Sequence, residues 1–382
     1  MAVSAKAKAE IMAKTIKEIQ KAMPDDIVGK YNEIGDRVDI KTISTGSLAV
    51  DFAIGGGFAR NKVIDIVGHT SSGKTTLALT AIAKLQKEEE NANVMYIDAE
   101  QALDPSYAEA LGVNMDNIIL MQPSSGENAF NAAEMFINSG VADLLVIDSI
   151  AAMLPKAMIE RSYDQEAQPG IFAKFITTGV ARLTRAANQR GCTVILINQW
   201  KPVVRMQQYQ AVPGAIGNWY QPGGAQLPFY CSQIIEVKKS GEIKSGKEVV
   251  SSIVTVTCKK NKIAPPYRSA DFVITYGKGI DKSQELVGLG VSLGVIKMPG
   301  RGVFSCPELT DKTFRGRQAL AAAIEQDNDF ADSLEKAIKA QMDGKKSLKI
   351  AGVEKSEDSE FAADDEGDSE SFVDNAEDQF EE

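Results

Sequence analysis

Apolar runs of strand length alternate with helix-like stretches from residue 63 onward. The runs cover residues 63–67, 94–98, 144–148 and 193–198, and each is followed by a polar turn. Their apolar residues follow one another without polar alternation, which is typical of strands buried on both faces of a parallel sheet. The pattern predicts an α/β fold in which helices cover a mostly parallel sheet.

Two later segments have the properties of antiparallel strands. Residues 232–240 and 251–260 are joined by a turn containing Ser245 and Gly246, and a third extended run follows at 272–276. A turn of this kind between extended runs favours a hairpin. We therefore expect antiparallel strands at one edge of the sheet, within a core domain that covers residues 38–281.

The N-terminal segment has helical rather than strand spacing. Met12, Ile16, Ile19 and Met23 form one apolar stripe on a helix that Pro24 ends. We expect residues 1–37 to be this helix and a linker. The stripe needs a partner, which is either the chain's own core or a neighbouring subunit.

The C-terminal part separates into a helical segment and a polar tail. Residues 282–342 have apolar residues at helical spacing, and we expect a small C-terminal α/β domain there. Residues 343–382 are expected to be a disordered acidic tail, because a polar, acidic segment buries too little surface to offset the cost of ordering it.

Composition excludes several classes of protein. At 382 residues and 41.1 kDa, with 44% hydrophobic and 25% charged residues, the chain has ordinary globular composition and room for two or three domains. No apolar run is long enough to span a membrane, and no signal peptide is recognisable. The four cysteines match neither metal-site spacing nor a disulfide framework. We expect a soluble, cytoplasmic protein in a reducing compartment.

The net charge of −10 is concentrated at one end of the chain. Residues 354–382 contain 14 acidic residues and one lysine, so residues 1–353 have a net charge of +3. The body of the protein is mildly basic and is compatible with a polyanionic partner. The tail either maintains solubility or competes with such a polyanion.

A phosphate-binding motif follows the first buried run. Residues 68–75 fit G-x-x-x-x-G-K-[ST] between a strand and a helix, the context this motif requires. The glycines allow backbone N–H groups to surround the phosphates, and Lys74 adds an ammonium group. We expect a nucleotide to be bound by Gly68, Ser71, Ser72, Gly73, Lys74, Thr75 and Thr76. His69, the only histidine, receives no catalytic role.

Polar residues end the other buried runs. Asp148 is placed to hold Mg²⁺ together with Thr75, and either Asp98 or Glu100 could polarise an attacking water. Gln199 is placed to sense the γ-phosphate of the nucleotide. Because ligands bind at the carboxyl ends of parallel strands, we expect these side chains to converge on one nucleotide.

A long segment after Gln199 has an unusual composition. Residues 200–224 contain no acidic residue, include both tryptophans, and have prolines and glycines that argue against regular structure. Aromatic and cationic side chains without acids suit single-stranded nucleic acid, and the alternative is a protein-contact loop. The expected contacts are Trp200, Lys201, Arg205, Tyr209, Trp219 and Tyr220. The loop at 155–170 is a weaker candidate.

Several motifs in the same order resemble the RecA family of DNA recombinases. They are the segments 41–47, 68–75, 96–105, 146–149, 197–199 and 260–264, and the likeness is close over roughly residues 40–280. The resemblance implies a RecA-like P-loop ATPase core. It also implies an ATP-dependent recombinase that forms a helical filament on single-stranded DNA and promotes pairing with homologous duplex in recombinational repair, with hydrolysis resetting the filament.

The resemblance also assigns roles to single positions. It implies that Glu100 activates water, that Asp104 and Tyr107 border the adenine, and that Phe229 signals between subunits. Lys260 and Lys262 resemble a pair that reaches the neighbouring subunit's ATP site. It further implies that the N-terminal helix docks on the next subunit and that the acidic tail is autoinhibitory.

The chain departs from the family pattern at His69, Gln101 and Pro228, and its C-terminal domain lacks the family's aromatic cluster near residue 304. Two alternatives belong to other classes of protein: a small-molecule phosphotransferase and a scaffold that binds ATP without hydrolysing it. ATP turnover measured with and without single-stranded DNA separates them.

Overall fold

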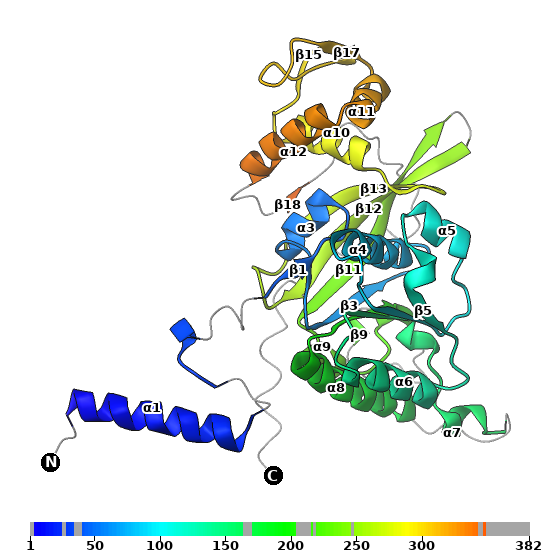
Figure 1. Ribbon diagram of the computed structural model, residues 1–382. Helices are drawn as coiled ribbons and strands as arrows, with labels where there is room; N and C mark the ends of the chain where they lie inside the picture. Colours follow the sequence, from blue (N-terminus) through cyan, green and yellow to red (C-terminus); the bar gives the residue numbers. More distant parts are fainter. Residues whose placement is uncertain are drawn as a thin grey trace.

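The computed structural model describes residues 4–24, 28–33, 40–162, 170–203, 215–216, 219–245, 248–342 and 347–348. Its centre is a ten-stranded sheet in the order β14-β13-β12-β11-β3-β7-β6-β4-β5, with β18 beside β13 (Figure 1). The predicted α/β architecture, a mostly parallel sheet with antiparallel strands at one edge, is confirmed.

Five strands form the parallel part of the sheet, with β3 also parallel to the first strand of the hairpin. They are β3 (Val63–Gly68), β4 (Val94–Asp98), β5 (Ile118–Met121), β6 (Leu144–Asp148) and β7 (Thr193–Gln199). Four of them follow the predicted runs. β5 was not predicted, because it is the edge strand and leaves Ile119 and Leu120 48% and 45% exposed, without the continuous burial of the others.

The antiparallel strands follow along the other half of the sheet. They are β11 (Gln233–Ser245), β12 (Glu248–Asn261), β13 (Ser269–Thr275) and β14 (Gly279–Ile280), and β11 and β12 pair as the expected hairpin. Their order extends the sheet from β3, so that residues far along the chain lie beside the phosphate-binding motif.

Successive residues of each buried strand point to opposite sides of the sheet, so both faces carry apolar side chains. Helices cover each face. On one face, Ile64 and Ile66 pack with α3 (Leu48–Ile54) and α4 (Lys74–Glu88). On the other, Val63 and Val67 pack with α6 (Gly126–Asn138) and α8 (Ile171–Arg190). Figure 1 shows α6 and α8 together below the sheet. Each continuous apolar run thus contributes side chains to two hydrophobic cores, one on each face of the sheet.

The N-terminal helix α1 (Ala5–Ala22) begins at Ser4, whose hydroxyl accepts a hydrogen bond from the Ala7 amide. Its apolar stripe is largely uncovered, with Met12 55% and Met23 53% exposed. The exposure favours the neighbouring-subunit alternative over packing on the chain's own core. No helix in the described part of the chain has the length and apolar character to span a membrane.

The C-terminal region packs its own core around three helices and a small sheet. The helices are α10 (Lys282–Ser292), α11 (Arg317–Gln326) and α12 (Asn328–Met342), and the strands are β15 (Lys297–Gly300), β16 (Val303–Ser305) and β17 (Thr313–Arg315). The fully buried Glu285 joins it to the core domain by accepting hydrogen bonds from Ser47, Leu48 and Ala49 at the start of α3.

Two expectations about irregular segments need correction. Residues 347–348, expected within the disordered tail, form β18 (Ser347–Leu348) against β13, because Leu348 is buried in the C-terminal core. The segment 200–224 contains three short strands, β8 (Lys201–Pro202), β9 (Ala215–Ile216) and β10 (Trp219–Tyr220), in the order β8-β10-β9. Pro202 fits because it lies on an edge strand. The rest of the tail lies outside the described residues.

Candidate functional site

The phosphate-binding motif connects the end of β3 to the start of α4. Gly73 has φ +97°, and a Cβ atom on it would lie 2.4 Å from Ile274 Cδ1. A Cβ on Gly68 would lie 2.2 Å from the Val237 carbonyl oxygen. Both positions therefore require glycine, and the motif forms the tight loop before a helix N-terminus that phosphate groups bind.

Lys74 points back into this loop and is only 6% exposed. Its Nζ donates hydrogen bonds to the carbonyl oxygens of His69 at 2.7 Å and of Gly68 at 3.1 Å. Burial lowers the pKa of Lys74 to about 8, although Asp148 and Glu100 oppose that shift. A buried ammonium satisfied mainly by neutral carbonyls is a favourable position for a phosphate anion.

Thr75 and Asp148 meet between α4 and the end of β6. The Thr75 hydroxyl donates to Asp148 Oδ2 at 2.7 Å, and the Tyr96 hydroxyl donates to the same oxygen at 2.8 Å. Burial raises the pKa of Asp148 despite these bonds. Hydroxyl and carboxylate oxygens are the ligands that Mg²⁺ prefers, and they leave positions for water and phosphate, so the pair fits this ion.

No group of three or more His, Cys, Asp or Glu side chains within the described residues is placed to hold a metal ion.

Glu100 lies at the centre of a small hydrogen-bond cluster. Its Oε1 accepts from the Ser149 hydroxyl at 2.5 Å and from Gln199 Nε2 at 2.6 Å. These residues follow or end β4, β6 and β7, which are adjacent strands whose carboxyl ends share one edge of the sheet. The structure thus brings together the residues expected to converge there, while their chemical roles stay predictions.

Asp98 is oriented differently from Glu100. Its carboxylate accepts hydrogen bonds from the Ala102 and Leu103 amides, at 3.1 and 3.2 Å, and from Gln122. Asp98 therefore holds the loop after β4. Of the two carboxylates that the sequence offered for water activation, Glu100 is the one that contacts the other site residues.

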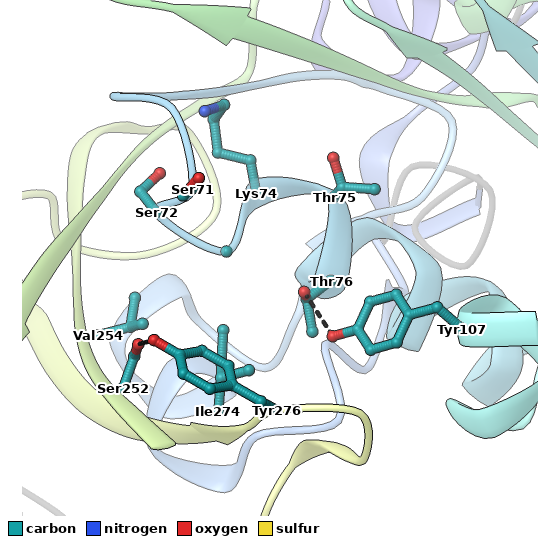
Figure 2. Close-up of a pocket in the computed structure, with 11 residues that line it drawn as sticks. Ser71, Ser72, Lys74, Thr75, Thr76, Tyr107, Ser252, Val254, Ile274 and Tyr276 are labelled. Atoms are coloured by element: carbon teal, nitrogen blue, oxygen red, sulfur yellow. Dashed lines mark hydrogen bonds between the residues drawn. The ribbon is translucent and has the colours of Figure 1, made fainter. Parts of the chain in front are cut away.

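A cavity of about 210 Å³ opens beside the phosphate-binding loop (Figure 2). It is lined by residues 71–76, Tyr107, Ser252, Val254, Ile274 and Tyr276. The hydroxyl groups of Tyr107 and Thr76 are hydrogen-bonded at 2.9 Å, and those of Tyr276 and Ser252 at 2.6 Å. Apolar and aromatic walls next to a phosphate site suit a nucleotide base.

Sequence reasoning missed four of these lining residues. Ser252, Val254, Ile274 and Tyr276 come from β12, β13 and the turn after it, far along the chain from the motif. No local signal marks them, because only the pairing order of the strands brings them here. Asp104 caps α5 (Pro105–Ala110) by accepting from the Ser106 and Tyr107 amides and is not among the residues that line the cavity, so its place beside the adenine stays a prediction.

Lys260 and Lys262 lie at the opposite end of β3 from the phosphate-binding loop. The Lys262 amide donates to Ser232, whose own amide donates to Val63 at the start of β3. Lys260 Nζ donates to the Pro228 carbonyl at 2.5 Å, next to Phe229, which is 74% exposed. Burial, and then Lys262, lower the pKa of Lys260. Neither lysine is among the residues that line the cavity beside the phosphate-binding loop.

The long loop is attached to the phosphate-binding motif at its start. The Trp200 amide donates to the Gly68 carbonyl at 3.4 Å, and the Trp200 side chain packs on the core beside α8. Lys201, Trp219 and Tyr220 are half-buried in the small sheet. Arg205 and Tyr209 lie outside the described residues, as does part of the loop at 155–170. Its described part includes the short helix α7 (Lys156–Ile159).

Comparison with known proteins identifies relatives that match this chain over most of its length. The family model described as the RecA N-terminal domain matches residues 10–281. Protein RecA of Blastochloris viridis is 38% identical over 363 residues, which cover 93% of this chain and 99% of that one. Protein RecA of Caulobacter vibrioides is 36% identical over 348 residues, which cover 89% and 92%. The solved structure of the RadB recombinase gives a TM-score of 0.44 at 24% identity, over 63% of this chain and 98% of that chain.

Proposed function

The chain belongs to the RecA family of recombinases, which act in DNA recombination and repair, and from this membership we propose a specific mechanism for it. ATP bound between adjacent subunits locks a helical filament on single-stranded DNA, the filament pairs that strand with homologous duplex, and ATP hydrolysis releases it. The proposal depends most on one observation: Gln199, the residue before the long loop, donates directly to the Glu100 carboxylate.

Lys74 would bind the phosphates directly, and the Thr75–Asp148 pair would act on them through Mg²⁺. Lys74 exchanges its two carbonyl acceptors for phosphate oxygens, since hydrogen bonds between charged groups are stronger. Thr75 and Asp148 would hold Mg²⁺, which neutralises charge on the β- and γ-phosphates when bound. The base would lie against the apolar and aromatic residues of the cavity, which are Tyr107, Val254, Ile274 and Tyr276.

Glu100 is proposed as the base that orients and deprotonates the attacking water. In the structure its Oε1 accepts hydrogen bonds from Ser149 and Gln199. A γ-phosphate oxygen would attract the Gln199 amide, which frees Glu100 for water and moves the start of the long loop. Binding of ATP and the shape of the DNA-binding loop are thereby coupled through one side chain.

The filament would be completed by surfaces that remain exposed in one subunit. Lys260 and Lys262 of one subunit would stabilise the phosphates bound by the next, in the manner of arginine fingers. The uncovered stripe of α1 and the exposed Phe229 fit contacts between such subunits. The four cysteines are free and buried, which fits the reducing cytoplasm that we propose as its location.

The test is ATP turnover by the full-length protein with Mg²⁺, measured with and without single-stranded DNA. We expect hydrolysis to ADP and phosphate that DNA stimulates severalfold. Turnover indifferent to DNA would indicate a small-molecule phosphotransferase, and ATP binding without turnover would indicate a scaffold. Either result would overturn the proposed mechanism.

A further inference from the structure

The only histidine of the chain packs against a tryptophan of the long loop. The ring centroids of His69 and Trp219 are 4.5 Å apart, and the ring planes lie at 81° to each other. Aromatic rings prefer this edge-to-face arrangement, which adds to the stabilisation from buried area. Burial, followed by the charge of Lys74, lowers the pKa of His69, so the ring is neutral near pH 7. The contact joins the phosphate-binding loop to the candidate DNA-binding loop.

The backbone of His69 is connected to the phosphate-binding lysine. Lys74 Nζ donates to the His69 carbonyl at 2.7 Å, a shorter distance than the 3.1 Å to Gly68. Phosphate oxygens compete for the same ammonium protons and form stronger, charge-assisted hydrogen bonds. Phosphate binding would therefore remove a hydrogen bond from the residue whose ring holds Trp219.

Trp219 lies in a segment that is attached on both sides. In β10 it pairs with Pro202 of β8, which begins two residues after Gln199. On the other side, Gln221 donates to the buried carboxylate of Asp65 in β3, and Asn198 Nδ2 donates to the Pro222 carbonyl at 3.1 Å. Movement of Trp219 relative to His69 would therefore be transmitted to the strands that start the loop.

We propose that the His69–Trp219 contact is a second connection between the bound nucleotide and the long loop, separate from Gln199. The inference rests on the proposed function. Without nucleotide, the contact holds the Trp219 ring on the phosphate-binding loop. With ATP bound, the ring is released and becomes available to stack on a base of single-stranded DNA. His69 and Trp219 act here as positioning residues.

Intrinsic fluorescence tests this connection directly, because the chain has two tryptophans and Trp200→Phe leaves Trp219 as the only one. Mg²⁺ and the slowly hydrolysed analogue ATPγS are added to saturation without DNA. We expect the Trp219 emission to shift to longer wavelength. In the double variant Trp200→Phe/His69→Ala, the emission should already be shifted and should not respond. The inference would be overturned if the Trp219 emission did not change when the nucleotide is added. It would also be overturned if the emission of Trp200→Phe and that of Trp200→Phe/His69→Ala changed equally.

DNA affinity provides a second measurement that a purely structural role would not change. The ratio of single-stranded DNA affinities with ATPγS and without nucleotide should fall by about 2- to 12-fold in His69→Ala, the range expected for one aromatic pair. His69→Phe, which keeps a ring, should restore most of the ratio. Equal losses with and without ATPγS would contradict coupling.

The two proposals fail in distinguishable ways. If single-stranded DNA stimulates ATP turnover of the wild-type protein but Trp219 ignores the nucleotide, only the second connection is wrong. If DNA does not stimulate turnover of the wild-type protein at all, the proposed function itself is wrong.

Discussion

The two ends of β3 differ in how complete they are within one subunit. At the carboxyl end, Lys74 is 6% exposed, and Thr75, Asp148, Glu100 and Gln199 are hydrogen-bonded to one another in pairs. At the amino end, Lys262 is exposed and Phe229 is 74% exposed, while Lys260 is half-buried and donates a hydrogen bond to the Pro228 carbonyl. We call the first end the finished end, because its polar groups find partners within one subunit, and the second end the half site, because we proposed that a neighbouring subunit completes it.

This difference has a physical reason. A buried ammonium or carboxylate costs free energy unless hydrogen bonds compensate it, so the chain must supply those partners itself. An exposed lysine such as Lys262 is solvated by water and needs no partner until another subunit approaches. The first end of one subunit would bind the nucleotide, and the second end of a neighbouring subunit would complete the binding site. Such a head-to-tail contact is a heterologous interface, which generates helical filaments.

The largest effect is expected from removing the ammonium group at the finished end. Lys74→Ala should lower ATP turnover by at least about 100-fold, because preorganised charge at a transferring phosphoryl group dominates such catalysis. DNA-stimulated phosphate release is the measurement. Lys87→Ala, an exposed lysine in the last turn of the same helix, is the matched control. Comparable turnover in Lys74→Ala and the control would remove Lys74 from the site.

Removing the two lysines of the half site should lower ATP turnover about as much as Lys74→Ala does. Mixing the two defective variants should restore part of the turnover. Lys260→Ala/Lys262→Ala should hydrolyse ATP poorly, because its nucleotide sites lack the neighbour's charges. Mixed with an equal amount of Lys74→Ala, it should regain up to about one quarter of wild-type turnover, the fraction of random head-to-tail interfaces that pair an intact loop with intact lysines.

The control for this experiment is Lys244→Ala, an exposed lysine at the other end of the β11–β12 hairpin, which should behave like the wild-type protein. No recovery in the mixture would argue that both lysines act within their own subunit, and the contrast between the two ends of β3 would then be wrong.

A smaller loss of ATP hydrolysis is expected from replacing Glu100 by glutamine, which keeps the shape of the side chain at the finished end. Glu100→Gln should bind ATP with little change in affinity while hydrolysis falls by about 10²- to 10⁴-fold, the usual contribution of a general base. Nucleotide affinity and single-turnover hydrolysis are measured separately. Glu109→Gln, an exposed acid on α5, is the control. Lost ATP binding would assign Glu100 a role in binding instead.

The two ends also differ in how far the sequence predicts them. The phosphate-binding loop is visible because eight consecutive residues form it, and Asp148 and Gln199 are visible because each ends an apolar run. Tyr276 and Ser252 were missed, since only strand pairing across the sheet brings them to the cavity. Lys260 and Lys262 were singled out by resemblance alone, because an exposed lysine leaves no local pattern.

Asp65 shows the same limit inside the sheet. An acid in a run of buried residues gives no indication of its partner, and Gln221, which contacts it, is 156 residues away along the chain. The contact depends on the path by which the long loop returns to β3. Neither the residues of β3 nor those of the loop contain a local pattern that predicts this path.

The smallest expected effect concerns this carboxyl group, midway between the two ends of β3. Burial raises the pKa of Asp65 from 3.8 to about 7, while its hydrogen bonds oppose the shift, and one of its carboxyl oxygens has no hydrogen-bond partner within the described part of the chain. The folded protein therefore keeps a proton that the unfolded chain loses above pH 4. The free energy of unfolding should fall as pH rises from about 4 to about 7, by at most about 4 kcal/mol from this group.

Asp65→Asn should remove that contribution, because an amide can still accept the hydrogen bond from Gln221 but does not titrate. Between pH 5 and 7, urea unfolding should show the wild-type protein losing up to about 3 kcal/mol more than the variant does. Glu285, the other fully buried acid with a pKa of about 7, supplies the comparison: Glu285→Gln should flatten the same pH range from the C-terminal domain. If the wild-type and Asp65→Asn curves run parallel while Glu285→Gln flattens, Asp65 is ionised in the folded state. In that case the Asp65–Gln221 contact is a charged attachment of the loop, stronger than the neutral one inferred here.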